Sequence, residues 1–487
     1  MRKHLRRSAL SPLGALVLAA CAPDLGPVSA PAAYSLGRAA NVVQAPQYVV
    51  LSKKHSLPAT LEAEVTAAGG RLVNAIPQIG VAVVEGGREF AGNAAGFAWA
   101  ESVAPDLVVD WLGEGDLPQV EVEADASSQS HAFDPQAESF YGFQWAPQSI
   151  DAPAAWAAGI TGQGARVAVL DGGIYNLHRD LVDRVDVARS RSFTTGAYNT
   201  DLGNLWHGTH VAGIVAASAN GIGTIGIAPE ATIIGVKVLH NGSGPFSAII
   251  NGIVYAATPI ADGGAGAHVI NMSLGAAFDE KDPAIKAAVR ELSKAVDRAT
   301  TYAYQLGTTV VVSAGNTGIN WDVEKTLLKL PAQNAHVISV SATGPHGWAL
   351  GRSEFSRLAY YSDHGKSLLS LSAPGGNAGL IVVEGNTSSC SMRSGTTVFA
   401  TACYVFDQVI STSRGTGTST TSYAWAQGTS MAAPAVSGIV ALLTQQHGAM
   451  HPSQVLARLQ QGAADLGQPG KDEYYGHGWV NAWRTLR

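Results

Sequence analysis

The stretch Gly428-Thr429-Ser430-Met431-Ala432-Ala433-Pro434 places a serine where a loop enters a buried helix. Sequence rich in Ser, Thr and Gly precedes it, and apolar residues follow it at helical spacing, namely Val436, Ile439, Val440, Leu442 and Leu443. A helix N-terminus offers free N–H groups and the positive end of the helix dipole. Ser430 is therefore either a plain helix cap or a nucleophile whose oxyanion those N–H groups stabilise.

Two further stretches carry the partners that a serine nucleophile needs. Val167-Ala168-Val169-Leu170-Asp171-Gly172-Gly173 indicates a buried strand that ends in a carboxylate, and His207-Gly208-Thr209-His210-Val211-Ala212-Gly213 opens another helix of small residues. A serine hydroxyl is a poor nucleophile until a base takes its proton, and a histidine oriented by a carboxylate is such a base. Asp171 alone could be a generic loop acid, and His207 alone a structural histidine. Their joint occurrence favours catalysis.

With these motifs the chain resembles the subtilisin-like serine proteases, or subtilases, whose triad has the chain order Asp, His, Ser. The resemblance runs from about Phe140 to Arg487, and a fourth stretch, Val312-Ser313-Ala314-Gly315-Asn316, ends in the family's oxyanion-hole asparagine. It implies four roles: Ser430 as nucleophile, His207 as general base and later acid, Asp171 as the group that holds the imidazole, and Asn316 as an oxyanion donor beside the Ser430 backbone N–H.

One position departs from the family pattern. The residue after the family's aspartate is usually serine or threonine, whereas this chain has Gly172. We therefore expect Asp171 to be less firmly held and activity to be lower. Gly172 is also the only feature that favours a second hypothesis, a catalytically silent subtilase fold that serves as a binding scaffold.

The resemblance also implies a substrate pocket. Ser273-Leu274-Gly275 resembles one wall of the family's primary pocket, and Ala314-Gly315 the other. These residues are small or apolar and no carboxylate falls in the matched positions, so we expect a broad preference for apolar side chains on an extended peptide that pairs with strand edges. The alternative is that both stretches are strand ends without a binding role.

A calcium site is implied in the same way. Asp180 has the position of a calcium-ligating aspartate, and Ser218-Ala219-Asn220-Gly221-Ile222-Gly223-Thr224 aligns without gaps to the family's calcium loop. Side-chain and backbone oxygens suit this hard cation. The expected ligands are Asp180, Ser218, Asn220, Ile222 and Thr224. No residue clearly matches the family's N-terminal glutamine ligand, and the alternative is a surface turn rich in Asn and Gly.

Strand-like apolar runs alternate with helical ones across the second half of the chain, which predicts a parallel sheet covered on both faces. In such sheets the active site lies at the carboxyl ends of the strands, and Asp171, Ser273 and Asn316 each directly follow an apolar run. We predict an α/β, subtilisin-like three-layer fold with a mostly parallel sheet for residues 139–487.

Residues 47–120 predict a separate small domain. Their runs follow the order β-α-β-β-α-β, which is typical of a ferredoxin-like α+β fold, and this resembles the inhibitory propeptide of subtilases. The alternative is an unrelated accessory domain. The acidic, aperiodic run 121–138 predicts an exposed processing junction, and we expect Leu117 to Glu138 to lie in the cleft like a substrate and be cut there.

The first residues predict an export signal, residues 1–21. A basic start precedes an apolar run, Ala9 to Ala20, that is too short to span a bilayer as a stable anchor. It ends in Leu18-Ala19-Ala20-Cys21, which resembles the bacterial lipobox, in which the cysteine is lipidated. The alternative is an ordinary signal peptide. Residues 22–46, rich in Pro, Ala and Gly, predict a flexible linker.

The two remaining cysteines, Cys390 and Cys403, lie in one Ser/Thr/Gly-rich segment between Leu371-Ser372-Ala373-Pro374-Gly375 and Gly428. We interpret this segment as an insertion close to the active-site face. Because exported proteins keep disulfides, we expect a local bridge between the two cysteines. The alternative is a pair of buried free thiols.

The composition argues against nucleic acid as a binding partner. Only 14% of the 487 residues are charged and the net charge is −6, which is not the basic balance of a nucleic-acid-binding protein. Taken together, we predict an exported, lipid-anchored, subtilisin-like serine endopeptidase made as a self-processed zymogen. Its partners would be protein or peptide substrates and its own propeptide, with structural calcium and membrane contact only through the lipid.

Overall fold

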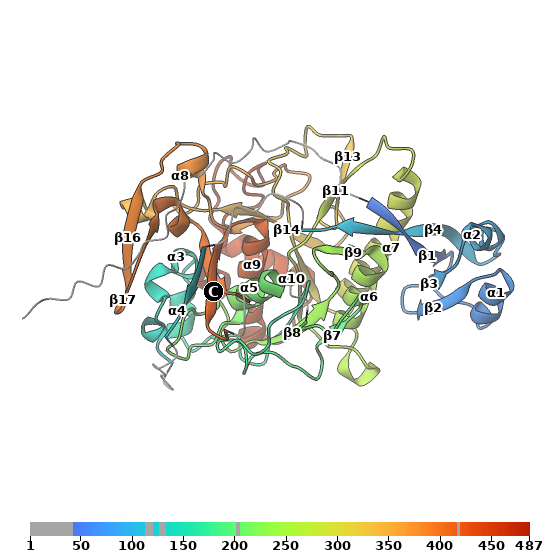
Figure 1. Ribbon diagram of the computed structural model, residues 1–487, viewed down its shortest axis with the longest axis horizontal. Helices are drawn as coiled ribbons and strands as arrows, with labels where there is room; N and C mark the ends of the chain where they lie inside the picture. The colour runs from blue at the N-terminus through green and yellow to red at the C-terminus, as the bar shows by residue number, and fades with distance from the viewer. Residues whose placement is uncertain (1–41, 113–119, 126–132, 201–204, 416–418) are drawn as a thin grey trace, which may run out of the picture. The chain divides into compact units, whose positions relative to one another are not determined.

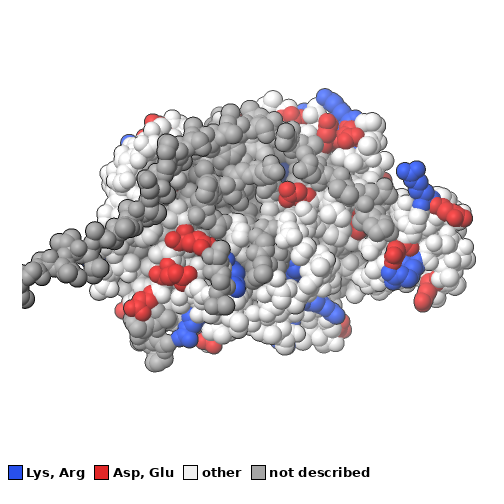
Figure 2. Space-filling model, viewed as in Figure 1, with Lys and Arg blue, Asp and Glu red and all other residues white. Residues whose placement is uncertain are grey.

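The computed structural model describes residues 42–112, 120–125, 133–200, 205–415 and 419–487 (Figure 1). The predicted lipidation site Cys21 and the predicted signal and most of the linker lie outside these residues. Within the described ranges no helix is both long and apolar enough to cross a membrane. On the face drawn in Figure 2, acidic and basic side chains lie in small separate groups.

A seven-stranded parallel sheet organises residues 139–487. Its order is β15-β14-β12-β10-β6-β8-β7, and every neighbouring pair is parallel. The strands are β6 (Arg166–Asp171), β7 (Arg191–Ser192), β8 (Thr232–Lys237), β10 (Val269–Met272), β12 (Thr309–Ser313), β14 (Val337–Thr343) and β15 (Leu371–Pro374). Most of their residues are buried because helices cover both faces, which explains their continuous apolar runs.

Alternate residues of the central strands β6, β8, β10 and β12 belong to two separate cores. One core joins Val167 and Val311 to helices α5 (Leu205–Ala216) and α9 (Thr429–His447). The other joins Ala168 and Val310 to helices α6 (Phe246–Ala257) and α7 (Lys286–Gln305). The sheet is therefore the middle of three layers, and the predicted subtilisin-like three-layer fold is confirmed.

The N-terminal elements have the predicted order β-α-β-β-α-β. They are β1 (Val42–Ser52), α1 (Leu61–Ala67), β2 (Arg71–Ile76), β3 (Val81–Glu85), α2 (Arg88–Ala94) and β4 (Ala100–Asp110). The strand order β2-β3-β1-β4, antiparallel throughout, is ferredoxin-like. One face packs on α1 and α2 through Tyr48 and Val50, and the other contributes Val49 and Leu51 to the core that contains α6 and α7.

The N-terminal sheet also continues into the second half of the chain. Strand β4 pairs with β9 (Ser243–Pro245) through the contacts Val108↔Pro245, Val109↔Gly244 and Asp110↔Ser243. An ion pair joins Arg298 Nη2 on α7 to Glu101 Oε2 on β4 at 2.6 Å. The described part of residues 47–120 is thus held against the parallel-sheet layers along a shared strand edge.

The acidic run 121–138 is more ordered than its sequence indicated. Val120–Glu123 forms strand β5, which pairs with β19 (Ser422–Ala426), and β19 pairs in turn with β18 (Val409–Thr412). The reason is the local alternation Val-Glu-Val-Glu, whose period of two suits an edge strand. Residues 126–132 of the predicted junction lie outside the described residues.

The remaining elements connect these layers. They are η1 (Pro135–Ala137), η2 (Tyr141–Phe143), α3 (Trp145–Ser149), α4 (Ala152–Ala157), η3 (Ile260–Asp262), β11 (Ala276–Asp279), β13 (Leu327–Leu330), η4 (Trp348–Leu350), α8 (Gly379–Val382), β16 (Ser389–Ser394), β17 (Thr397–Ala402), η5 (Cys403–Asp407), α10 (Pro452–Gly462) and α11 (Ala482–Thr485).

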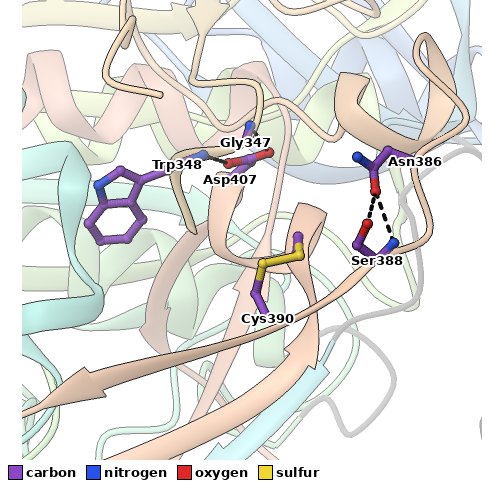
Figure 3. The surroundings of a disulfide bond; sticks show 7 residues. Gly347, Trp348, Asn386, Ser388, Cys390 and Asp407 are labelled. Carbon is purple, nitrogen blue, oxygen red and sulfur yellow. Dashed lines mark hydrogen bonds between the residues drawn. A yellow bond between two sulfur atoms is a disulfide. The ribbon is translucent and has the colours of Figure 1, made fainter. Parts of the chain in front are cut away.

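The cysteine-containing segment is a hairpin fastened at its base (Figure 3). Strands β16 and β17 pair antiparallel, and a disulfide joins Cys390 to Cys403 with their Cα atoms 4.8 Å apart. Next to it, the buried Asp407 carboxylate accepts hydrogen bonds from the backbone N–H groups of Gly347 and Trp348, both at 2.7 Å. Burial raises the pKa of Asp407 to about 7. The disulfide thereby joins β16 to the start of η5, and Asp407 at the end of η5 joins that segment to η4.

We expect the disulfide to stabilise this segment. Replacing both cysteines, Cys390→Ala with Cys403→Ala, should lower the free energy of unfolding by about 2–4 kcal/mol, because a short loop is no longer closed in the unfolded chain. Chemical denaturation with and without reductant measures this. Reductant should destabilise the unmodified protein and leave the double variant unchanged, and equal stability of the two proteins without reductant would contradict the expectation.

Candidate active site

The predicted catalytic residues come from different elements that meet at one edge of the parallel sheet. Asp171 is the last residue of β6, Ser273 follows β10, and Asn316 lies three residues beyond β12. Because these strands are parallel, their carboxyl ends lie at the same edge. Helix α5 brings His207 and the first turn of α9 brings Ser430 to the same region.

Asp171 and His207 form a buried pair. The His207 Nδ1 atom is 2.8 Å from Asp171 Oδ2, and both side chains are almost fully excluded from solvent. Gly208 permits this approach, since a Cβ atom there would lie 2.2 Å from the Gly173 carbonyl oxygen and 3.1 Å from Asp171 Cβ. The carboxylate therefore sets the orientation of the imidazole, with Nδ1 as the protonated ring nitrogen that donates to it.

Gly172 contributes its backbone to the carboxylate. The Gly172 N–H donates to Asp171 Oδ1 at 2.6 Å. The Gly172 carbonyl in turn accepts a hydrogen bond from the buried Lys237 Nζ at 3.1 Å, and Lys237 pairs with Asp171 across β6 and β8. Both carboxylate oxygens thus have partners although no side-chain hydroxyl follows Asp171, a support that sequence reasoning missed.

Helix α5 is fixed to the strands that lead to Ser430. The His210 Nε2–H donates to the Ala424 carbonyl of β19 at 2.9 Å, and burial lowers the pKa of His210 to about 4. The Thr412 hydroxyl of β18 donates to the Thr209 carbonyl at 2.7 Å. These contacts fix the position of His207 relative to the loop that carries Ser430.

Ser430 lies beside the predicted oxyanion donor. The Asn316 Oδ1 atom accepts hydrogen bonds from the N–H and the hydroxyl of Thr429, both at 2.9 Å, so the carboxamide is held with its Nδ2 group near Gly428. Ser430 is in the first turn of α9, where backbone N–H groups have no acceptor within the helix. Its hydroxyl donates to the Ser273 carbonyl at 3.2 Å, and the Ser273 hydroxyl donates to the Ser430 carbonyl at 2.7 Å.

The two predicted pocket walls lie close to this group. Ser273 contacts Ser430 directly, and Leu274 and Gly275 continue from it, whereas Ala314 and Gly315 lead into Asn316. Between the walls lies a residue that the sequence analysis did not assign. A Cβ atom on Gly315 would lie 2.3 Å from Lys329 Nζ, and one on Gly275 would lie 3.6 Å from Lys329 Cε.

The end of β4 occupies the neighbouring strand edge. The Trp111 N–H donates to the Gly242 carbonyl at 3.0 Å, the Trp111 carbonyl accepts from the Gly275 N–H at 2.9 Å, and the indole N–H donates to the Gly244 carbonyl at 2.8 Å. The Trp111 ring packs against Phe246 and Phe278. An extended segment of the chain therefore pairs with the edge next to the pocket wall, as a bound peptide would.

The predicted calcium-loop residues gather around Asp180, which is fully buried. Its carboxylate accepts hydrogen bonds from the Thr224 N–H at 3.2 Å and from the Asn220 amide at 3.2 Å, while the Ser218 N–H donates to its carbonyl. The Ile222 N–H donates to Asn220 Oδ1. Burial raises the pKa of Asp180 to about 8.

Glu138 joins this cluster and was missed by sequence reasoning. Its Oε1 atom accepts from the Gly221 N–H at 2.8 Å, and burial together with the nearby Asp180 raises its pKa to about 8. Three buried oxygens of the cluster, Glu138 Oε2, Ser218 Oγ and Thr224 Oγ1, lack a hydrogen-bond partner within the described residues. Two acidic side chains and unpartnered oxygens fit a hard cation, although no group of three His, Cys, Asp or Glu residues that could hold a metal occurs there.

Comparison with known proteins identifies the family to which the chain is similar. The model of the subtilase family matches residues 162–478. Subtilisin Savinase of Lederbergia lenta is 34% identical over 344 residues, which are 70% of this chain and 98% of that protein, and M-protease of Shouchella clausii is 34% identical over 344 residues, 70% of each chain. The crystal structure of fervidolysin from Fervidobacterium pennivorans, a keratinolytic enzyme related to subtilisin, superposes with a TM-score of 0.64 at 24% identity, over 90% of this chain and 60% of that one.

We expect Gly208→Ala to separate His207 from Asp171, because the added methyl group overlaps the Gly173 carbonyl. A displacement of about 1 Å in such a site costs roughly 100-fold in rate. The rate at which a fluorophosphonate modifies Ser430 measures this. Gly92→Ala, where the added methyl group meets no atom within 4 Å, is the matched control and should react normally. An unchanged rate in Gly208→Ala would contradict the expectation.

Proposed function

The chain belongs to the subtilase family of serine proteases, and on that premise we propose that it is an exported endopeptidase that acts through Asp171, His207 and Ser430. The observation that carries this proposal is the buried 2.8 Å contact between His207 Nδ1 and Asp171 Oδ2 at the sheet edge where Ser430 and Asn316 also lie. Its substrates would be proteins or peptides that bind in an extended form.

The proposed reaction is acyl transfer through the serine hydroxyl. His207 Nε2 takes the Ser430 Oγ proton as Oγ attacks the carbonyl carbon, and then gives that proton to the leaving amine. Asp171 stabilises the imidazolium through the Nδ1 hydrogen bond. The Asn316 amide and the Ser430 N–H stabilise the oxyanion, and losing one such donor typically costs about 2.7–4 kcal/mol. A water molecule then attacks the carbonyl carbon of the acyl-enzyme. His207 takes the proton of this water and returns it to Ser430 Oγ, which leaves as the second product is released.

The rival hypothesis, a silent scaffold, rested on Gly172. The hydrogen bonds that the Gly172 backbone makes to Asp171 and Lys237 argue against it, because the carboxylate is held without a neighbouring hydroxyl. Labelling of Ser430 by a fluorophosphonate tests the choice, since a scaffold without an activated serine would not react.

We also propose that residues 47–120 act as an inhibitory propeptide that the enzyme removes. Two observations support this. The end of β4 pairs with the substrate edge at β9 and Gly275, and β5 pairs with β19, the strand that leads into the Ser430 loop. Residues 113–119, which join these two places in the sequence, lie outside the described residues. Cleavage in this connection would precede the whole of the predicted 121–138 junction and would leave β5 attached to the mature enzyme.

Export is supported by the family, whereas the lipid anchor at Cys21 rests on the sequence alone and stays a prediction. Structural calcium is a further proposal. Asp180 and Glu138 would hold the ion, with Asn220 and the backbone carbonyls of Ser218, Ile222 and Thr224, and the ion would supply positive charge that stabilises the two buried carboxylates.

We expect Ser430→Ala to abolish peptide hydrolysis, with kcat lower by about 10⁶-fold, because the nucleophile is lost while little volume changes. The same variant should accumulate as full-length precursor, which mass spectrometry of the protein made without another protease detects. Ser391→Ala, which removes the hydroxyl of an exposed serine on β16, is the control and should still be trimmed. Normal trimming of Ser430→Ala would exclude self-processing, and wild-type turnover would exclude the mechanism.

We expect a calcium chelator to lower the melting temperature of the protein by about 5–10 °C, because a ligand bound only to the folded state adds a few kcal/mol of stability. Asp180→Asn should lower the melting temperature in calcium and remove most of the chelator effect. Asp183→Asn, an exposed neighbour, should leave both unchanged. If chelation has no effect on the unmodified protein, the calcium proposal is wrong.

A further inference from the structure

We propose that Lys329 sets the specificity of the primary pocket, so that the enzyme prefers a substrate side chain with a hydrogen-bond acceptor at its end, glutamate or glutamine, over an apolar one. The side chain in question belongs to the residue whose carbonyl carbon is attacked, and is called the primary side chain below. The inference rests on the proposed function, because Ser430 and Asn316 define how the substrate is oriented.

The direction of the primary side chain follows from these two groups. If the attacked carbon faces Ser430 Oγ and its oxygen faces the Asn316 amide, the side chain on the adjoining Cα atom enters the space between the segments that carry these contacts. One segment is Ser273–Gly275, whose first residue bonds to Ser430, and the other is Ala314–Gly315, which precedes Asn316.

Lys329 lies at the inner end of that space. It is on β13, which pairs with β11 directly after Gly275, and its side chain is only 4% exposed. A methyl group on Gly315 would lie 2.3 Å from Nζ and 2.6 Å from Cε. Both pocket walls therefore lie next to the outer part of the Lys329 side chain. This side chain makes the pocket shorter, and its ammonium group forms the inner end of the pocket.

The ammonium group of Lys329 has N–H donors that its protein neighbours do not all accept. Asp363 is the one carboxylate in contact with it within the described ranges, with Oδ2 3.3 Å from Nζ, and this Oδ2 atom accepts no hydrogen bond there. The other oxygen, Oδ1, is held by the Thr317 N–H and hydroxyl and by the Ile319 N–H. Asp363 thus neutralises and positions Lys329, while the three N–H groups of the ammonium are not all used.

The chemistry of the primary side chain follows from this. An apolar side chain would bury the ammonium without giving it an acceptor, which is costly. A carboxylate or carboxamide supplies that acceptor, and a second ammonium would be repelled. Because Asp363 already balances the charge of Lys329, we expect glutamine and glutamate both to be accepted. A site that bonds a polar substrate group typically discriminates more strongly than an apolar pocket.

Peptides that differ only in the primary side chain test the proposal. We expect kcat/KM for Glu and Gln to exceed that for Leu by tenfold or more in the unmodified enzyme, and this ratio to fall at least tenfold in Lys329→Met, which keeps the length but removes the charge and donors. Lys325→Met, an exposed lysine four residues earlier, is the matched control and should keep the ratio. In Asp363→Asn, Glu should gain over Gln, because the balancing charge is gone.

The outcomes separate this inference from the proposed function. Fluorophosphonate labelling of Ser430 does not depend on the primary side chain, so an enzyme that labels but prefers Leu overturns the role of Lys329 alone. An enzyme that fails to label overturns the proposed function. If Lys329→Met does not fold, the profile of the unmodified enzyme still decides, since a preference for Leu or Phe contradicts the proposal. An unchanged ratio in a folded Lys329→Met also overturns it.

Discussion

The close approach of helix α5 to the end of strand β6 is the constraint on which the active-site arrangement depends. The Asp171–His207 hydrogen bond exists only because Gly208 has no side chain to meet the Gly173 carbonyl. Both residues are buried, so neither can be solvated by water if the contact is lost, and the cost of an unpaired buried group enforces the pairing. Strand β6 carries the Asp171 carboxylate and helix α5 carries the His207 imidazole. The surrounding contacts keep α5 and β6 at a fixed distance from each other.

Hydrogen bonds of the side chains of His210, Thr412 and Asn316 connect the rest of the site to that pair. His210 and Thr412 fasten α5 to β18 and β19, and β19 leads directly into the loop that carries Ser430. Asn316 is oriented by Thr429, the residue before the serine. Groups that must act together are thereby joined through rigid elements, which is the condition for stabilising charge that appears only during the reaction.

The N-terminal domain uses the same strand edges that a substrate would use. Its β4 strand pairs with β9 and reaches Gly275 through Trp111, and β5 extends the sheet that positions the serine loop. One segment thus covers the substrate edge while the next adds a strand beside the nucleophile. Under the proposed propeptide role, this arrangement would link inhibition to assembly of the site, because both would depend on pairing at exposed strand edges that otherwise lack partners.

Local sequence determined the three-layer class, the chain order of the motifs and the residues at the strand ends, because alternation of apolar strands and helices fixes a parallel sheet and its carboxyl edge. It could not identify contacts between residues distant in the chain. Glu138 beside Asp180 looked like the end of a structureless run, Val120–Glu123 gave no sign of its partner β19, and no motif singled out Lys329. Only the tertiary structure decides such cases, since what a charged side chain does depends on which buried groups the fold brings against it.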